Sequence, residues 1–283
     1  MLIKNNQCMI LGQNIVYKDK YDNSLLCSIS RSLARKEIDI SPSLPFLGFD
    51  IWNCYELSWL NMKGKPEVRI LELVVNANSE NIVESKSLKY YLNSFNNTNF
   101  QDDNEVKCLI ESDLNNLLKS SILVTIKTLE AYDNNKLNVF HGQNLDLIDI
   151  EAEVVFGNSK IDRNILHLSQ DDTFVEETLY SNLLKSNCLV TGQPDFASVQ
   201  ISYKGKKIAQ DSLLKYLISF RNHNEFHEQC VERIWNDIQN ICKPLELTVY
   251  ARYTRRGGID INPIRSSCDL AITSLNNLRH IRQ

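Results

Sequence analysis

The chain has 283 residues, of which 43% are hydrophobic, enough for one large or two small domains with a sizeable core. Its 31 basic and 35 acidic side chains give a formal net charge of -4, which argues against a whole-chain surface for nucleic acid. The polar N-terminal segment does not resemble a signal peptide, and no apolar run is long enough to span a membrane, so we expect a cytoplasmic protein.

The first half predicts strands, then two helices, then a closing strand. A turn at residues 60–66 precedes an apolar run at residues 66–75, which is typical of a strand. Apolar side chains then recur at i, i+3, i+4 and i+7 along residues 87–100, the pattern of an amphipathic helix. A less regular stripe over residues 106–117 indicates a second helix, and residues 121–132 are expected to form the closing strand. The first stripe consists of Leu88, Tyr91, Leu92 and Phe95, and the second of Val106, Leu109, Ile110, Leu114 and Leu117.

The second half predicts the same order of elements. Apolar and polar residues alternate over residues 199–203, which predicts a half-buried strand. Residues 212–226 carry the first helical stripe again, and residues 224–242 predict a second helix that ends before a proline. Strict alternation over residues 245–253 predicts a strand, which residues 256–258 turn into a further strand. The two helical stripes consist of Leu213, Tyr216, Leu217 and Phe220, and of Val231, Ile234, Trp235, Ile238 and Ile241.

This self-similarity predicts two copies of one α+β module with antiparallel sheets. We place the N-terminal module at residues 1–150. Residues 151–283 form a linker and the C-terminal module. The linking region, about residues 145–180, is rich in acidic residues and has only a weak pattern.

The eight cysteines contain no CxxC or similarly close pair, which argues against a zinc site. Without a secretory signal, reduced thiols fit best, and most are expected to be buried small side chains, so the roles of Cys54 and Cys230 stay open. Cys188 differs because it lies in a polar loop that a substrate could reach. Asp195, seven residues later, could act as its proton donor or base, although a structural Pro-Asp turn also accounts for the pair.

Three further polar clusters allow both a structural and a functional interpretation. His227 and Glu228 stand in the first turn of a predicted helix, where a carboxylate is stabilising; Glu228 could instead accept two hydrogen bonds from a purine-like edge. The sequence ESKSLK at residues 84–89 predicts a helix N-terminus capped by one of its serines. Alternatively, its glutamate binds the base of a substrate and a lysine binds a phosphate group. The sequence RYTRRGG at residues 252–258 predicts either the solvent-exposed end of a β-hairpin or a phosphate-binding site. In the second case the arginines bind the phosphate and the glycines let the backbone approach it closely. No GxGxxG follows a strand, so a Rossmann domain is not supported.

Five motifs in order along nearly the whole chain resemble the NADPH-dependent 7-cyano-7-deazaguanine reductases, the QueF family of queuosine biosynthesis, in its long two-module form. The motifs are GFDIWNCYELSWLN, ESKSLKYYLNSF, LLKSNCLVTGQPDFASVQISYKG, SFRNHNEFHE and VYARYTRRGGIDINP. The resemblance implies an α+β protein of two tandem tunnelling-fold (T-fold) modules, whose antiparallel sheets each carry a pair of helices on one face. It also implies a homodimer in which motifs from both halves build one site. ESKSLK occurs only in the first half, and CLVTGQPD only in the second.

The same resemblance implies reduction of 7-cyano-7-deazaguanine to 7-aminomethyl-7-deazaguanine with two NADPH. Cys188 matches the nucleophile that adds to the nitrile carbon as a thioimide, and Asp195 matches the proton donor to the nitrile nitrogen. No metal, no membrane and no direct contact with tRNA is implied. The substrate contacts match Val83, Glu84, Ser85, His227 and Glu228, and the cofactor contacts match Ser85, Lys86, Arg256 and Gly257.

Two other functions stay open on the sequence. A cyclohydrolase-like enzyme of the same fold would need a Cys/His zinc set, and the dense histidine cluster of His223 and His227 lacks a spaced cysteine pair. A non-catalytic purine- or pterin-binding module would leave the spacing of Cys188 and Asp195 unexplained.

Overall fold

The structure is a computed structural model, and it describes residues 18–133, 137–151, 161–270, 277 and 279–283. The chain divides into two compact units, which we describe one at a time. Unit 1 consists of Met1–Pro42, Asp50–Lys136 and Arg255–Asp260, and unit 2 of Ser43–Phe49, Leu137–Thr254 and Ile261–Gln283. Within the described ranges, no helix is both long and apolar enough to cross a membrane.

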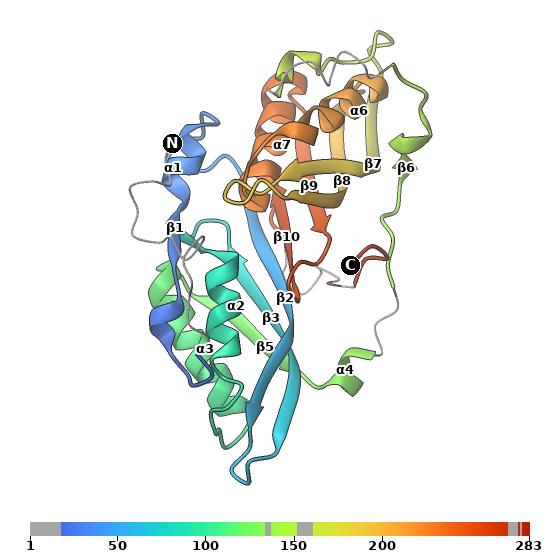
Figure 1. Cartoon of the computed structure of the whole chain (residues 1–283). Coiled ribbons are helices and arrows are strands. Elements are labelled where there is room, and N and C mark those ends of the chain that lie inside the picture. Colours follow the sequence, from blue (N-terminus) through green and yellow to red (C-terminus); the bar gives the residue numbers. More distant parts are fainter. Residues whose placement is uncertain (1–17, 134–136, 152–160, 271–276, 278) are drawn as a thin grey trace. The chain divides into compact units, whose positions relative to one another are not determined.

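Unit 1 is a sheet with two helices across one face (Figure 1). Its strands follow the order β5-β3-β2, and β3 and β5 are antiparallel. A separate two-stranded sheet pairs β1 with β4. The elements are β1 (Ser28–Ser30), α1 (Arg31–Lys36), β2 (Leu47–Leu60), β3 (Pro66–Asn76), β4 (Asn81–Val83), α2 (Ser85–Asn93), α3 (Asp103–Leu118), β5 (Ile122–Lys127) and α4 (Leu129–Asp133).

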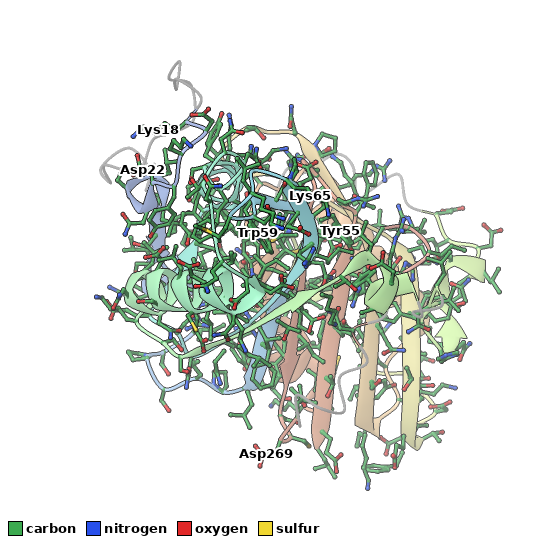
Figure 2. The ribbon with its side chains drawn as sticks, turned by 90° about the horizontal axis from the view of Figure 1, so that it is seen from below. Lys18, Asp22, Tyr55, Trp59, Lys65 and Asp269 are labelled. Carbon is green, nitrogen blue, oxygen red and sulfur yellow. The ribbon has the colours of Figure 1, made fainter. Side chains whose placement is uncertain are left out.

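Aromatic side chains on β2 anchor the core and the edge of unit 1. Figure 2 shows Tyr55 and Trp59 on this strand and Lys65 in the turn that follows it. The Trp59 side chain is only 1% exposed, and the Arg69 guanidinium lies 5.3 Å from the centre of its ring. The hydroxyl of Tyr55 donates to the buried carboxylate of Asp260 at 2.7 Å, so this hydroxyl has its hydrogen-bond partner within the same unit.

Unit 2 repeats this arrangement with a longer sheet, in the order β10-β9-β8-β7-β6. Neighbouring strands from β7 to β10 are antiparallel, and the short β6 runs parallel to β7. Helices α6 and α7 pack against this sheet (Figure 1). The elements are β6 (Gln143–Asn144), β7 (Phe174–Asn187), β8 (Pro194–Lys206), α6 (Gln210–Ser219), α7 (His227–Cys242), β9 (Glu246–Tyr253) and β10 (Ile259–Ser266).

The predicted helical stripes are the buried faces of α2 and α6. Their side chains are at most 4% exposed, because each helix turns its apolar stripe onto the sheet of its own unit. The α+β class, the antiparallel sheets and the order of strands, two helices and strands in each half are therefore confirmed. The buried stripes are Leu88, Tyr91 and Leu92 on α2 with Phe95 just past its end, and Leu213, Tyr216 and Leu217 on α6 with Phe220 just past its end.

Some predicted element limits are wrong. The predicted strand at residues 121–132 ends at Lys127, and α4 follows, because the backbone and side-chain oxygens of Thr128 accept hydrogen bonds from Tyr132 and Ala131. The predicted strand at residues 245–253 begins one residue later, since Leu245 is 70% exposed. In α3 the buried stripe includes Leu118, whereas Leu109 and Leu117 are only partly buried.

A buried ion pair ties β10 to α7 inside unit 2. The Arg265 guanidinium lies 2.8 Å from the Glu232 carboxylate, and both side chains are almost wholly buried, at 0% and 3% exposed. Arg265 also donates to the carbonyl oxygen of Phe49 at 3.1 Å. Removing one partner of such a pair leaves a buried charge that the protein interior cannot solvate.

We expect Arg265→Met to lower the free energy of unfolding by about 3–5 kcal/mol, measured by urea denaturation. The double variant Arg265→Met/Glu232→Leu is expected to recover most of that loss, because it buries no charge. As a control, Lys206→Met removes an exposed ion pair with Asp172 and should change stability by less than about 1 kcal/mol. A loss for Arg265→Met no larger than that of the control would contradict the buried-charge account.

Candidate active site

Cys188 lies in the closed loop that joins β7 to β8. Its backbone N–H donates to the carbonyl oxygen of Gln193 at 2.8 Å, and its own carbonyl accepts from the N–H of Gly192 at 2.9 Å. Gly192 has a φ of 67°, in the left-handed region that favours glycine, so the loop can close tightly. The Cys188 side chain is partly exposed, and a substrate can therefore reach this thiol.

The residue before the thiol ties the loop to the start of α7. The N–H of Asn187 donates to the carbonyl oxygen of His223 at 2.8 Å, and the N–H of Glu225 donates to the carbonyl oxygen of Asn187 at 3.0 Å. The side chains of Asn187 and Asn224 are also hydrogen-bonded, at 3.1 Å. The loop that carries the thiol and the segment that leads into α7 are therefore held side by side.

Asp195 and His227 meet next to this loop. Asp195 lies on β8 opposite Ser186, and its side chain is 3% exposed. His227 is the first residue of α7, and its Nε2 atom lies 3.3 Å from the Asp195 carboxylate. The structure thus brings Asp195 and His227 into contact next to the loop that carries Cys188, although these residues lie up to 39 positions apart in the sequence.

The imidazole of His227 stacks face to face on the buried ring of Tyr253. The ring centres are 3.8 Å apart and the planes differ by 6°. Tyr253 covers one face of the imidazole, and the ring presents its Nε2 edge to Asp195. Tyr253 is 0% exposed on β9, and sequence reasoning recognised it only as an inward-facing strand residue, with no signal for a role in the site.

A second thiol lies in this buried cluster. Burial, and then the charge of Glu225, raise the pKa of Cys230 above its usual range. Burial also raises the pKa of Tyr253, and Cys230 and Asp195 contribute in the same direction. The hydroxyl of Tyr253 has no hydrogen-bond partner of ordinary geometry in the described part of the chain. Cys230 is therefore a neutral buried thiol at physiological pH, whereas the Cys188 side chain is partly exposed.

Glu228 follows His227 in the first turn of α7 and is 4% exposed. The position agrees with the predicted first turn, where the helix dipole favours a carboxylate. Glu225, just before the helix, is fixed by the Arg233 guanidinium, whose Nε lies 2.9 Å from its carboxylate. This ion pair anchors the first turn of α7 and with it the directions of His227 and Glu228.

In unit 1, Glu84 caps the helix that begins the ESKSLK motif. Its two carboxylate oxygens accept the backbone N–H groups of Lys86 at 3.0 Å and Ser87 at 2.7 Å. The sequence-based expectation that a serine caps α2 is therefore wrong, because Glu84 is the N-cap. Val83 is buried at the end of β4, while Ser85 and Lys86 are exposed at the start of the helix.

Arg256 and Gly257 form a tight turn in the same unit. The backbone groups of Arg256 and Ile259 exchange two hydrogen bonds, of 2.9 and 3.1 Å. Lys89, from the second turn of the ESKSLK helix, donates to the carbonyl oxygen of Gly257 at 2.9 Å. The proposed cofactor residues of α2 and of this turn thus belong to one unit and are connected by a side chain that the sequence did not single out.

Among the residues that the structure describes, no group of three or more His, Cys, Asp or Glu side chains is placed to hold a metal ion. The remaining cysteines of this part of the chain therefore form no metal site. Burial, with the charge of Asp260, raises the pKa of Cys54, as expected for a structural thiol. Cys27 is disulfide-bonded, so the expectation of uniformly reduced thiols is wrong for this residue. Cys8 lies outside the described residues.

Comparison with known proteins covers both halves of the chain. Residues 17–126 match the family described as "Nitrile reductase, 7-cyano-7-deazaguanine-reductase N-term", and residues 194–271 match the family described as "QueF-like protein". Proteins named NADPH-dependent 7-cyano-7-deazaguanine reductase from Polaromonas sp. (strain JS666 / ATCC BAA-500) and Ralstonia nicotianae (strain ATCC BAA-1114 / GMI1000) are 51% and 52% identical to the chain. Each alignment covers 96% of this chain and 97% of the relative.

A solved structure of the archaeosine synthase QueF-Like in the apo form overlaps 35% of this chain and 96% of its own, at 17% identity and a TM-score of 0.30, too low to carry an argument. The architecture and site by themselves define an α+β protein of two compact units, with a reachable thiol in a loop next to an Asp–His pair. The full-length similarity completes the assignment. The chain belongs to the family of NADPH-dependent 7-cyano-7-deazaguanine reductases.

The stack of His227 on Tyr253 predicts that the ring of Tyr253, and not its hydroxyl, supports activity. Tyr253→Phe keeps the stacked ring and removes a buried hydroxyl, so we expect NADPH oxidation within about threefold of the unaltered chain. Tyr253→Leu removes the aromatic contact and should lower the rate about 2- to 12-fold further. Steady-state assays over a range of pH, on variants checked by thermal unfolding, make the comparison. Equal losses in both variants would assign the effect to the hydroxyl instead.

Proposed function

We propose that this chain reduces the nitrile of 7-cyano-7-deazaguanine to the aminomethyl group of 7-aminomethyl-7-deazaguanine, with NADPH as hydride donor, in queuosine biosynthesis. Identity of about one half with relatives named for this activity, over 96% of the chain, supports the proposal. The observation that carries the chemistry is the reachable Cys188 thiol in a loop fixed beside the Asp195–His227 pair.

The proposed reaction begins at Cys188. Its thiolate adds to the nitrile carbon while Asp195 gives a proton to the nitrile nitrogen, which forms a thioimide. Hydride addition to the thioimide carbon gives the anion of a thiohemiaminal; its C–S bond then breaks, Cys188 leaves as the thiolate and a neutral imine remains. A second hydride on carbon and a proton on nitrogen complete the amine. Two hydrides and two protons are consumed, so Asp195 must regain a proton between the two reductions.

We assign the substrate base to carboxylates and their neighbours. Glu228 can accept two adjacent N–H groups of a purine-like edge, a geometry that suits a carboxylate. His227 lies beside it, at the start of α7. For the first half we propose Val83, Glu84 and Ser85; each oxygen of Glu84 already accepts one backbone N–H and keeps capacity for another.

The residues proposed for NADPH suit a phosphorylated ligand. Ser85 and Lys86 are exposed at the start of α2, where a hydroxyl, a cation and the helix dipole favour an anion. Arg256 is exposed in a turn whose glycines leave room for close approach, because they carry no Cβ. When bound, the nicotinamide supplies the hydride, and these residues hold the phosphate groups.

We infer in addition a cytoplasmic homodimer that acts on a free base and does not bind tRNA directly. The formal charge of -4 supports the last point, since a tRNA-binding surface is usually basic. The resemblance to the two-module family, whose motifs from both halves are expected to build one site, supports assembly.

The proposed function is tested by product stoichiometry. We expect two NADPH to be oxidised for each 7-aminomethyl-7-deazaguanine formed, measured by absorbance and by liquid chromatography of the product. Cys188→Ala should abolish turnover, while Cys108→Ala, which removes an exposed thiol elsewhere, should leave it unchanged. Binding of 7-cyano-7-deazaguanine without any NADPH oxidation by the unaltered chain would favour a purine-binding module instead.

The acid role of Asp195 predicts a selective loss. Asp195→Asn keeps the size of the side chain and one acceptor oxygen but removes its acid, so the rate of NADPH oxidation should fall roughly 100- to 10,000-fold. Substrate affinity, measured calorimetrically in a Cys188→Ala background, should change little. Undiminished turnover in Asp195→Asn would remove this residue from the mechanism.

A further inference from the structure

Lys185 joins the end of β7 to the segment that leads into α7. Its ammonium group donates to the side-chain oxygen of Asn187 at 2.7 Å and to the carbonyl oxygen of Arg221. Arg221 lies in the 3₁₀ turn Phe220–Asn222, which precedes α7. The side-chain amide of Asn187 in turn donates to that of Asn224 at 3.1 Å. One cation therefore connects the residue before the thiol to the segment before the helix.

Lys185 and Asp195 lie on opposite faces of the sheet. Because side chains alternate along a strand, residues 185 and 187 share one face of β7, whereas Ser186, which pairs with Asp195, lies on the other. Burial lowers the pKa of the Lys185 ammonium, the charge of Arg221 lowers it further, and Asp195 opposes both effects. An ammonium that has lost water needs oxygen acceptors, and Asn187 and Arg221 supply them. Lys185 is therefore placed to act through these two partners.

Unit 1 repeats the backbone link that holds the Cys188 loop. The N–H of Leu60 donates to the carbonyl oxygen of Thr98 at 2.9 Å, and the N–H of Phe100 donates to the carbonyl oxygen of Leu60 at 2.9 Å. These two bonds match, one for one, those that Asn187 makes in unit 2. Leu60 at the end of β2 therefore takes the place of Asn187 at the end of β7, and the backbone link is a property of the module.

Unit 1 has different side chains at both positions of the pair. Since Leu60 matches Asn187, the residue that matches Lys185 is Ser58. A serine is too short to reach across to a neighbouring segment, and a leucine has no polar atom that could accept a hydrogen bond. The module therefore folds without a cation at this place. The Lys185–Asn187 pair is an addition of the half that contains Cys188.

We propose that Lys185 is a positioning residue for the addition of Cys188 to the nitrile. The inference rests on the proposed function of Cys188 as the nucleophile. The backbone link holds only the main chain of Asn187, whereas Lys185 also fixes the Asn187 side chain and the turn before α7. The loop that begins at the next residue then keeps one orientation. Addition to a nitrile needs the sulfur aligned with the carbon, and a small misplacement lowers the rate.

The test uses Lys185→Ser, which introduces the side chain that unit 1 carries at this place, together with Lys185→Arg. The matched control is Lys204→Ser, which removes a partly exposed lysine of β8 that lies 3.9 Å from the Glu176 carboxylate. Stopped-flow absorbance follows thioimide formation with substrate alone. Alkylation of Cys188 by iodoacetamide is measured on its peptide by mass spectrometry, and unfolding curves check that each variant is folded.

We expect Lys185→Ser to slow thioimide formation about tenfold and to leave the dissociation constant for NADPH unchanged. Alkylation of Cys188 should not slow, because iodoacetamide needs an accessible thiol but no fixed orientation. Lys185→Arg, which keeps a donor at this place, should recover most of the rate, and Lys204→Ser should match the unaltered chain. In an Asn187→Leu background, Lys185→Ser should cost less than in the unaltered chain, since the two side chains act together.

Four other results would overturn the proposal. An unchanged rate of thioimide formation in Lys185→Ser removes Lys185 and leaves the proposed function in place. Equal losses of thioimide formation and of alkylation show that the cation acts on the protonation of the thiol instead of its position. Full additivity with Asn187→Leu shows that the two side chains act independently. An unaltered chain that forms no thioimide removes the proposed function together with the inference built on it.

Discussion

Asn187 exchanges two backbone hydrogen bonds with the segment before α7, and the chemistry of unit 2 depends on this link. It holds the end of β7, and therefore the Cys188 loop, beside the helix whose first residue is His227. Side-chain hydrogen bonds could not fix a loop thiol as firmly, because each adds rotamer freedom that a backbone pair lacks. The proposed nucleophile, the proposed acid and the imidazole of His227 are thus placed by the same antiparallel framework that forms the core.

The two repeated helices separate what the fold needs from what the site adds. Both α2 and α6 bury the same apolar stripe, so both halves can form a module. They differ at their starts: Glu84 caps α2 with two hydrogen bonds, whereas Ala209, the N-cap of α6, has no side chain to do so. A helix that forms without such a cap in one half indicates that the polar start of α2 serves a ligand as well as the helix. This is the physical basis for assigning Glu84, Ser85 and Lys86 to binding.

The helical stripes were predictable from the sequence because burial at a period of 3.6 residues leaves a local pattern, as Tyr91 and Tyr216 illustrate. Cys188 and Asp195 could be proposed from their loop and the family resemblance. The stack of Tyr253 on His227 and the bond from Lys89 to Gly257 could not, because each joins distant segments and leaves no periodic signal. The end of β5 was missed for a related reason: one hydroxyl, that of Thr128, converts an apolar run into a helical turn.

The central claim is that Cys188 adds to the nitrile before any hydride arrives. Intact-protein mass spectrometry after mixing the chain with 7-cyano-7-deazaguanine, without NADPH, tests it most directly. The account predicts one substrate mass added per chain and a new thioimide absorbance band, both absent in Cys188→Ala and both discharged when NADPH is added. An unmodified mass in the unaltered chain, or an adduct that persists in Cys188→Ala, would contradict it.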